Sequence, residues 1–464
     1  MLTYTFTDIG SDFLYEHLYK CIKNDILQGV LAPEEKLPSK RAFAKNLGIS
    51  TITIENAYAQ LTSEGYIYSL PKKGYFVTDI KNPLPVHAVL SNENVNFASG
   101  DLEYFADFAS NQTDSDNFPF SIWSKLMREL LNDNRVALMT NPPCGGILHL
   151  REAIADHLKQ FRGITVFPEQ IIIGAGTEYL YGLLIQLLGH DKIYAVENPG
   201  YQTIFKIYSS NHVVCKCVNM DQHGVDISEL ENSHADIIHL SPSHHFPTGI
   251  VTPISRRYEL LGWASKADSR YIVEDDYDSE FRLTGKPIPA LQNIDAMEKV
   301  IYINTFTKSL SSTVRISYMV LPKHLVNIFY SRLNFYSCTV SNFEQYTLAR
   351  FIKEGYFEKH INRMRNFYHA QRDLLLESIK KSPLSSYVTI SEEDAGLHFL
   401  MRVQTAIPDA VLIRKAAQNG IKLSCLSQYY VDDQQNAEHI FIINYSFIKR
   451  ERVDEAIQRL YQCL

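Results

Sequence analysis

The chain has 464 residues, of which 45% are hydrophobic and 21% are charged, and its formal net charge is -7. This composition is typical of a globular protein with two or three domains and excludes a disordered or fibrous chain. Because the chain is acidic overall, any contact with nucleic acid must depend on a local basic patch.

The sequence also bears on the compartment. No apolar stretch approaches the length of a membrane span, and the start of the chain lacks the apolar segment of a signal peptide. The seven cysteines are odd in number and scattered, which favours buried thiols over a disulfide framework. The "CKC" at 215–217 reads as part of a strand, and no second Cys or His pair completes a zinc set. We therefore expect a cytoplasmic protein with no metal site and no membrane contact.

The first 80 residues begin with a predicted amphipathic helix. The segment "FLYEHLYKCIKNDILQG" places Phe13, Leu14, Leu18, Ile22 and Ile26 on one helical face, and a glycine ends it. This face should pack against the elements that follow.

Two further helices and a hairpin complete this segment. Ser39 is a suitable N-cap for "KRAFAKNLG", and Ser50 is a suitable N-cap for "TITIENAYAQLTSEG". The short connection "LGIS" between them has the length of a helix-turn-helix, and "YIYSLPKKGYFVTDI" reads as two strands around a turn. This order of elements predicts a winged helix over residues 1–80.

Basic and hydroxyl side chains stand where a winged helix meets DNA phosphates and base edges. The residues that we expect to contact DNA are Ser39, Lys40, Arg41, Ser50, Thr51, Thr53, Lys72, Lys73 and Gly74. Acidic residues balance the basic ones in this segment, and Glu55 lies on the predicted recognition helix. Affinity should therefore be modest for one monomer and depend on a dimer. A protein-docking module is the alternative for this segment.

Residues 81–97 contain two prolines and no helical period, so we interpret them as a linker. Residues 98–464 then alternate strand-like runs with helical segments, which predicts a doubly wound α/β sheet. The runs are "IIIGAG", "KIYAVE", "DIIHLSP", "YIVEDD", "VIYINTF" and "ISYMVLP". From about residue 346 the pattern changes to a long helix followed by an α+β region.

Polar side chains follow several of these strands, at the edge of the sheet where α/β proteins bind ligands. In "GAGTE" the amides of Gly176 and Thr177 can point at a phosphate from the start of a helix. Tyr201, in "NPGY", offers a ring that can stack on a pyridine. In "VEDDYDSEF", Asp275 can hold a pyridinium proton and Tyr277 a ring hydroxyl.

The segment "NTFTKSLSSTVRISY" completes this set. Lys308 can form a Schiff base with an aldehyde, while Thr305, Thr307 and Arg315 can bind phosphate oxygens. Adjacent side chains at a strand end face opposite ways, so we assign a structural role to Asp276. Together these residues predict a site for an aromatic aldehyde that carries a phosphate.

The motifs "NPGY", "SPSHHFPTG", "EDDYDSEF" and "TFTKSLSSTVR", in this order, resemble the fold-type I aminotransferases that depend on pyridoxal phosphate (PLP). The stretch "LPSKRAFAKNLGISTITIENAYAQLTSEGYIYS" resembles a GntR-type winged helix. Nearly the whole chain thus resembles a MocR-type transcriptional regulator, and in particular the PLP-responsive regulators of vitamin B6 synthesis genes. The expected fold is α/β, an N-terminal winged helix-turn-helix joined to a fold-type I aminotransferase-like domain.

The resemblance implies a role for each matched residue. Lys308 would form the Schiff base, Asp275 would bind the pyridinium nitrogen, Tyr277 the ring hydroxyl, and Tyr201 would stack on the ring. The phosphate would be held by Gly176, Thr177, Thr305 and Arg315, with Thr307 beside them. The resemblance also implies a homodimer on paired DNA half-sites, because such domains build their sites at a twofold interface.

Several positions depart from the aminotransferase pattern. Phe246 replaces the asparagine that bonds the ring hydroxyl, and Asn141 stands nearest to a missing tyrosine that would reach the phosphate of a partner subunit. Ile442 takes the place of the arginine that binds the substrate carboxylate, and Gln202 and Thr203 supply no second arginine. Arg402 is a possible substitute or a structural residue. We therefore expect PLP recognition with weak or absent transaminase activity.

Three functions follow from this reading. The first is a DNA-binding regulator that PLP controls, with genes of PLP synthesis as targets. The second is an active aminotransferase with a DNA-binding arm. The third is a regulator that senses an amino compound through an external aldimine with PLP.

Overall fold

The computed structural model describes residues 2–6, 13–80, 103–110, 114–282, 289–394, 396–431 and 438–464. The chain folds into two compact units, an N-terminal unit, Met1–Asp101, and a second unit, Leu102–Leu464. The predicted linker, 81–97, lies outside the described residues. Among the described residues, no helix combines the length and the apolar character needed to cross a bilayer.

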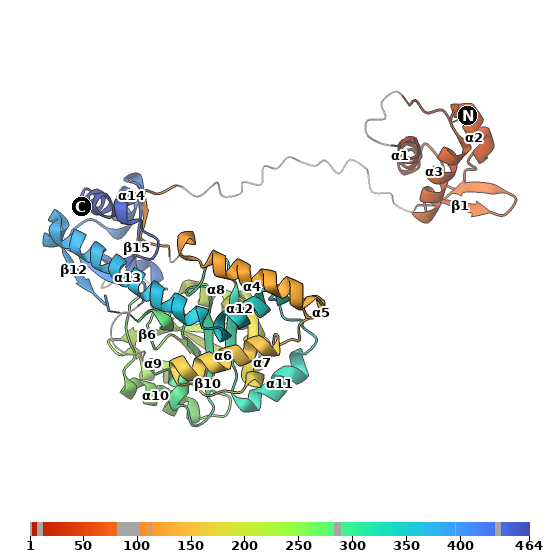
Figure 1. Ribbon diagram of the computed structural model, residues 1–464. Coiled ribbons are helices and arrows are strands. Elements are labelled where there is room, and N and C mark those ends of the chain that lie inside the picture. Colours follow the sequence, from red (N-terminus) through yellow and green to blue (C-terminus); the bar gives the residue numbers. More distant parts are fainter. Residues whose placement is uncertain are drawn as a thin grey trace. The chain divides into compact units, whose positions relative to one another are not determined.

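The N-terminal unit is a three-helix module with a β-hairpin, as the sequence predicts (Figure 1). Its elements are α1 (Leu14–Leu27), α2 (Lys40–Leu47), α3 (Thr51–Ser63), β1 (Ile67–Leu70) and β2 (Gly74–Val77). Ser39 and Ser50 cap α2 and α3, since their hydroxyls accept from the amides of Ala42 and Thr53. The hairpin strands pair antiparallel, with Ile67 opposite Val77.

The face of α1 differs in part from the prediction. Leu18, Ile22 and Ile26 are buried, but Phe13 and Leu14 are exposed. Phe13 is the N-cap and has extended backbone, so the helical period does not extend to its side chain. The core of the unit forms where α1, α2, α3 and the hairpin meet.

The second unit contains an eight-stranded sheet of order β4-β11-β10-β9-β8-β5-β6-β7. The strands from β10 to β6 run parallel, and β11 runs antiparallel to both of its neighbours. Their bounds are β4 (Ile171–Ala175), β5 (Ile193–Asn198), β6 (Val214–Asp221), β7 (Gly224–Val225), β8 (Ile237–Leu240), β9 (Tyr271–Asp275), β10 (Val300–Thr305) and β11 (Ile316–Val320). Each predicted strand is present, and Cys215 and Cys217 lie on β6.

Helices cover both faces of this sheet. Alternate residues of β4 belong to different clusters, with Ile171 and Ile173 on one face and Ile172 on the other. On the first face lie α4 (Phe120–Asp133), α6 (Leu148–His157), α12 (Asn342–Lys353) and α13 (Tyr356–Lys381), and Figure 1 shows α4, α6 and α12 side by side. The second face packs against α7 (Thr177–Leu188), α8 (Gln202–Ser210) and α11 (Lys323–Leu333).

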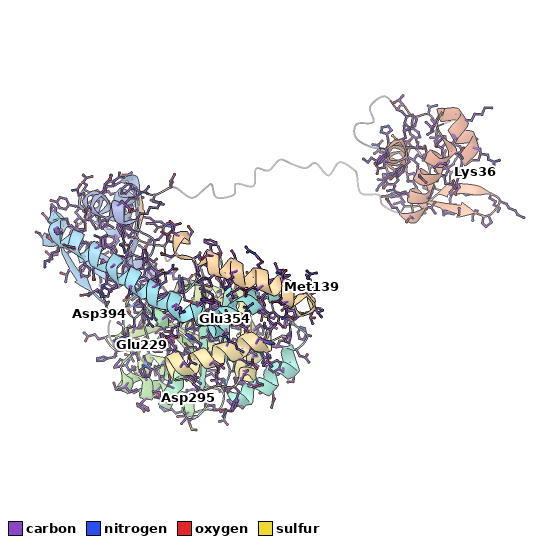
Figure 2. The ribbon with its side chains drawn as sticks, viewed as in Figure 1. Lys36, Met139, Glu229, Asp295, Glu354 and Asp394 are labelled. Atoms are coloured by element: carbon purple, nitrogen blue, oxygen red, sulfur yellow. The ribbon has the colours of Figure 1, made fainter. Side chains whose placement is uncertain are left out.

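The remaining elements extend these layers. The helices α9 (Ile227–Asn232) and α10 (Ile254–Ser265) pack on the sheet, and α5 (Arg135–Met139) follows α4. The C-terminal region adds α14 (Asp409–Gln418), α15 (Val453–Tyr461) and a four-stranded sheet of β12 (Val388–Ser391), β13 (His398–Val403), β16 (Ile440–Asn444) and β15 (Ser424–Cys425). A short pair joins β14 (Ile421–Lys422) to β3 (Ala106–Asp107). Side chains fill the layers, whereas Met139 at the end of α5 stands on the surface (Figure 2).

Candidate ligand-binding site and DNA-binding surface

The second unit has a cavity of about 390 Å³ at the carboxyl ends of its parallel strands. This is the edge at which ligands bind in open α/β sheets. All nine residues predicted to bind the cofactor line it, namely Gly176, Thr177, Tyr201, Asp275, Tyr277, Thr305, Thr307, Lys308 and Arg315. The fold thus brings together side chains that lie up to 139 positions apart, from Gly176 to Arg315.

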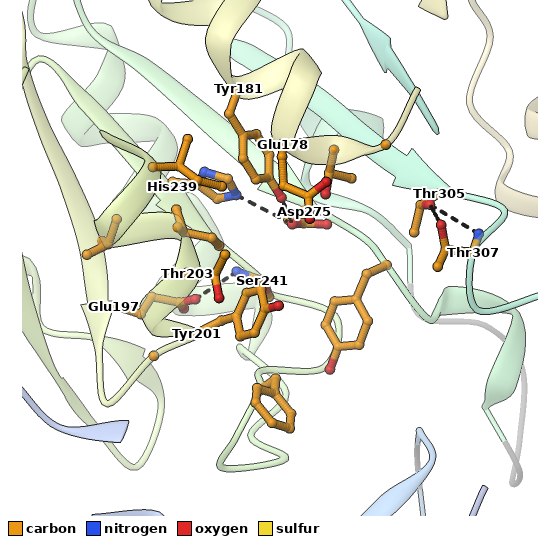
Figure 3. Close-up of a pocket in the computed structure, with 18 of the residues that line it drawn as sticks. Glu178, Tyr181, Glu197, Tyr201, Thr203, His239, Ser241, Asp275, Thr305 and Thr307 are labelled. Carbon is orange, nitrogen blue, oxygen red and sulfur yellow. Dashed lines mark hydrogen bonds and ion pairs between the residues drawn. The ribbon is translucent and has the colours of Figure 1, made fainter. Parts of the chain in front are cut away.

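The carboxylate of Asp275 has two close partners in this cavity, Tyr181 and His239 (Figure 3). The Tyr181 hydroxyl donates to its Oδ2 over 2.7 Å, and His239 Nε2 lies 3.5 Å from the same oxygen. The other oxygen, Oδ1, is buried and has no hydrogen-bond partner among the described residues. An unpaired buried carboxylate oxygen is costly, so Asp275 is prepared to accept a hydrogen bond from a ligand.

The neighbouring carboxylate, Asp276, points away from the cavity. Its Oδ2 lies 2.6 Å from Nη2 of the buried Arg162 and accepts from the Tyr302 hydroxyl over 2.7 Å. Asp276 is therefore structural, as the alternation of strand side chains predicts.

Lys308 follows β10 and reaches the cavity in a turn. Burial lowers the pKa of its amine from 10.5 to about 8, while the nearby Asp278 carboxylate opposes that shift. Asp278 Oδ2 lies 2.7 Å from His244 Nδ1, and the Tyr277 hydroxyl lies 3.4 Å from the same nitrogen. An amine with a lowered pKa is partly unprotonated at neutral pH and can act as a nucleophile.

The start of α7 could hold an anion. Gly176 is the N-cap, and no side chain caps the helix, so the first amides of α7 open toward the cavity. Gly176 has φ +91°, and a Cβ there would lie 2.4 Å from Arg315 Nη2. Arg315 forms an ion pair with Glu178 in the first turn of α7, so an incoming anion must share or displace this carboxylate.

The two threonines play different parts. Thr305 is buried, and its hydroxyl accepts from Ser317 Oγ over 2.8 Å and from the Thr307 amide over 3.1 Å. It donates to Thr307 Oγ1 over 2.8 Å (Figure 3). Thr305 thereby fixes the turn that leads to Lys308, and Thr307 is the more accessible of the two hydroxyls.

The far wall of the cavity is aromatic. The Phe246 ring meets Tyr201 and Tyr429 edge to face, at centroid distances of 6.1 and 5.2 Å. Behind it Phe246 and Tyr429 pack on an apolar cluster that contains Ile442. Ile442 is buried in this cluster and does not line the cavity.

No arginine occupies the positions after Tyr201 where a second arginine would bind a substrate carboxylate; they are Gln202 and Thr203. The Gln202 amide donates to the carbonyl of Gln428 over 2.7 Å, which ties α8 to the segment that bears Tyr429. Thr203 lines the cavity without a charge. Arg402 occupies an exposed position of β13 and does not line the cavity, which removes it as the substitute. Asn141 is exposed as well.

Several cavity residues carry no signal in the sequence. Tyr181 and His239 are spaced like ordinary core residues. The pairing of β8 with β9 brings His239 to Asp275, and the packing of α7 on β4, β11 and β10 brings Tyr181 there. Glu197 on β5 also lines the cavity, and burial raises the pKa of its carboxyl to about 8. The Ser241 amide donates to this carboxyl over 3.0 Å (Figure 3).

The predicted DNA contacts lie on the N-terminal unit, and several have internal partners. Ser39, Ser50 and Thr53 form the caps of α2 and α3, and Lys40 pairs with Glu55 over 2.7 Å. Arg41, Thr51, Lys72 and Lys73 are exposed, as are the capping residues Ser39 and Ser50, while Gly74 takes φ +112° in the hairpin. The hydroxyls of the caps therefore stabilise the helices that would present Arg41 and Thr51, whereas Lys72 and Lys73 lie in the turn between β1 and β2.

Comparison with known proteins identifies the family. Residues 105–460 match the aminotransferase class I and II family, and residues 14–77 match the bacterial regulatory proteins of the gntR family. The probable rhizopine catabolism regulatory protein MocR of Rhizobium meliloti is 30% identical over 467 residues, which cover 96% of this chain and 93% of that protein. The chain belongs to the MocR-type transcriptional regulators. The aminotransferase-like domain of this MocR-type regulator is a PLP-binding domain.

Other relatives agree with this assignment. The uncharacterized HTH-type transcriptional regulator YdeL of Bacillus subtilis is 38% identical over 417 residues, 90% of each chain. The HTH-type pyridoxine biosynthesis transcriptional regulator PdxR of Corynebacterium glutamicum is 27% identical and covers 88% of this chain and 87% of its own length. A kynurenine aminotransferase of Pyrococcus horikoshii has a similar fold, with a TM-score of 0.68 at 22% identity over 82% of this chain and 97% of its own.

Proposed function

We propose that this MocR-type regulator binds DNA under the control of PLP and that its targets are genes of PLP synthesis. The observation that carries the proposal is the division of the cavity into two halves. One half keeps Lys308, Asp275 and the open start of α7. The other half is walled by Phe246 and Tyr429, with Thr203 beside them and Ile442 buried behind them, and offers no arginine for a carboxylate at these positions. The site suits PLP and does not suit an α-amino acid.

In the half of the cavity that contains Lys308 and Asp275, a residue is available for each chemical group of PLP. The unpaired Oδ1 of Asp275 can accept a hydrogen bond from the protonated pyridine nitrogen. The amides at the start of α7, with Arg315 and Thr307, can hold the phosphate. Tyr201 can cover the ring, and Lys308 offers its amine. PLP supplies an aldehyde that reacts reversibly with primary amines.

The half of the cavity that Phe246 and Tyr429 form does not favour an active aminotransferase. A carboxylate placed against the Phe246 and Tyr429 wall would lose water without gaining a charged partner, which is unfavourable. The Gln202 amide is already bonded to a main-chain carbonyl. We therefore expect amino acids to bind poorly.

The regulated genes are inferred from one relative. PdxR of Corynebacterium glutamicum is named for pyridoxine biosynthesis and is similar over most of its length. A regulator that senses PLP and controls its synthesis closes a simple feedback loop, and this supports the same target class here.

We further propose that the chain acts as a homodimer. A dimer presents two winged helices to paired half-sites on DNA, which compensates for the balanced charge of each N-terminal unit. PLP can change DNA binding only in so far as it has different affinities for two arrangements of the dimer.

A gel-shift titration tests the proposal. Full-length protein freed of PLP is titrated on DNA from upstream of its own gene and of the PLP synthesis genes, with and without added PLP. We expect PLP to change the affinity or the stoichiometry of the complex. The Lys308→Ala variant should bind the same DNA and fail to respond.

The other outcomes discriminate between the alternatives. Equal DNA binding with and without PLP would overturn control by PLP itself and favour an amine as the signal. Rapid loss of the visible absorption band of bound PLP on adding common amino acids would favour an aminotransferase. No retardation of any of these DNA fragments would favour a protein-docking module.

A further inference from the structure

The outward face of α3 carries four residues at helical spacing. Ile52, Glu55, Asn56 and Ala59 follow one another at intervals of three, four and seven positions from Ile52, and all four are exposed. The buried residues of α3 point into the core of the N-terminal unit on the opposite side. In a helix-turn-helix, the second helix presents such a face to the major groove.

Ile52 is the unusual member of this face. Its side chain is 69% exposed in the first turn of α3, between Thr51 and Thr53. An isoleucine at this place gains nothing from packing in the free protein. In the major groove, an exposed apolar side chain complements the methyl group of thymine, which guanine, cytosine and adenine lack.

The polar residues on this face of α3 limit which DNA bases the helix could recognise. The helix α3 contains no arginine or lysine, which are the side chains that most often read guanine. Glu55 could read cytosine, but it is paired with Lys40 over 2.7 Å. Asn56 is exposed, and an asparagine amide can donate to and accept from the edge of adenine simultaneously.

We propose that α3 reads A·T base pairs, with the Ile52 side chain against thymine methyl groups and the Asn56 amide on an adjacent adenine. This inference rests on the proposed DNA-binding function and names the class of site that the regulator recognises. The lysines of the hairpin tip, Lys72 and Lys73, are consistent with it, because the narrow minor groove of A·T tracts attracts basic side chains.

The test begins without a known operator. Full-length protein, with and without PLP, selects duplexes from a random pool, and the enriched site is sequenced. The site is then made with uracil in place of each thymine in turn, which removes one methyl group and leaves base pairing intact. We expect one or two positions per half-site at which uracil weakens binding about fourfold, the effect of exposing one methyl group.

Variants connect these positions to the protein. In Ile52→Ala, binding to the thymine site should fall and the difference between thymine and uracil at those positions should disappear, which a double-mutant cycle measures. In Asn56→Ala, affinity should fall by about tenfold or more, and discrimination against guanine at one adenine should be lost. Val30→Ala is the matched control, since Val30 is also an exposed β-branched residue of this unit and lies outside α3.

The outcomes separate the inference from the function on which it rests. If no duplex is enriched, the DNA-binding function itself fails. If a site is enriched but uracil is tolerated at every thymine, or if Ile52→Ala keeps the sensitivity to uracil, the reading of thymine by Ile52 is wrong. A site without A·T pairs in its half-sites would overturn the inference entirely.

Discussion

At the residue scale, the chemistry of the cavity depends on the immediate surroundings of two ionisable side chains, Lys308 and Asp275. Lys308 and Asp275 lie in the same cavity, yet their partners differ. Lys308 is an amine whose charge is opposed by burial and favoured by Asp278. Asp275 is a carboxylate with one bonded oxygen and one oxygen that has no partner within the described part of the chain. These surroundings favour a nucleophilic role for the Lys308 amine and a hydrogen-bond acceptor role for the Asp275 carboxylate.

The lowered pKa of Lys308 predicts a pH dependence. Only the unprotonated amine attacks an aldehyde, so the rate at which added PLP gains its visible absorption band should rise with pH and level off above about 8. A lysine at its ordinary pKa would continue to gain rate up to 10.5. Stopped-flow absorbance across this range measures the inflection, and an inflection near 10.5 would contradict the effect of burial.

The same shift has a consequence for stability. The pKa of Lys308 is lower in the folded protein than in the unfolded chain, so the unfolded chain binds more protons between about 8 and 10.5. The contribution of Lys308 to the free energy of unfolding therefore rises with pH through this window. Below it, the folded protein bears the full cost of a buried ammonium group.

The adjacent aspartates give a matched pair of substitutions. Asp275→Asn should weaken PLP binding by about ten- to a hundredfold, because a charge-assisted hydrogen bond contributes about 1.5–3 kcal/mol. Asp276→Asn should leave PLP affinity nearly unchanged and lower the free energy of unfolding by about 3–5 kcal/mol, because Arg162 loses its buried partner. Absorbance titration and thermal unfolding measure the two quantities. If the effects were exchanged, the roles of the two carboxylates would be exchanged as well.

At the element scale, the junction of β4 and α7 is where we expect the phosphate of PLP to bind. The strand ends at Ala175, and the helix begins at Thr177, so Gly176 alone makes the turn. Its backbone has φ +91°, and its missing side chain leaves room for Arg315. An alanine there would push the guanidinium away from the start of the helix.

Two glycine substitutions test this junction. Gly176→Ala should weaken the binding of PLP more than that of pyridoxal, which has no phosphate. Gly182→Ala, within α7, meets no atom within 4 Å and should leave binding unchanged while raising stability by about 0.5–1 kcal/mol. Equal losses for PLP and pyridoxal in Gly176→Ala would mean that the junction does not hold the phosphate.

At the scale of the whole molecule, the proposed homodimer accounts for exposed apolar residues on α5. Val136 and Met139 are 83% and 76% exposed on α5, directly after the end of α4. A second copy of the chain would cover such a surface. The winged helices would then act as a pair.

Charge on this surface should separate the dimer. Val136→Lys is expected to shift the chain toward the monomer in sedimentation velocity and to reduce DNA affinity, because a monomer engages one half-site. Ile254→Lys introduces the same charge at an exposed isoleucine on α10 and should change neither property. A dimer that survives Val136→Lys would place the interface elsewhere.

Some of this protein was determined by local sequence. Turn residues, caps and alternating apolar runs predicted the winged helix, the parallel strands and the polar residues at strand ends, because these features depend on neighbours within a few positions. For that reason Lys308, Asp275 and Gly176 could be predicted to lie at one site, and all three line the cavity. Ser39, Ser50 and Thr53 were predicted as DNA contacts, and Ser39 and Ser50 also as the caps that the structure shows.

Only the tertiary structure decided the rest. Tyr181 became a partner of Asp275 because α7 packs on β4, β11 and β10, and His239 did so because β8 pairs with β9. No local pattern distinguishes these two residues from core residues. The aromatic wall of the cavity joins Phe246 and Tyr429, which are far apart in the sequence and both pack on Ile442. The hydrogen bond from Gln202 to the carbonyl of Gln428 ties α8 to the same C-terminal segment. The pairing of Lys40 with Glu55 likewise depends on α2 and α3 meeting, and Ile52 and Asn56 are exposed beside this pair on α3. Contacts between distant segments set these features, because their energy depends on packing that the local sequence does not encode.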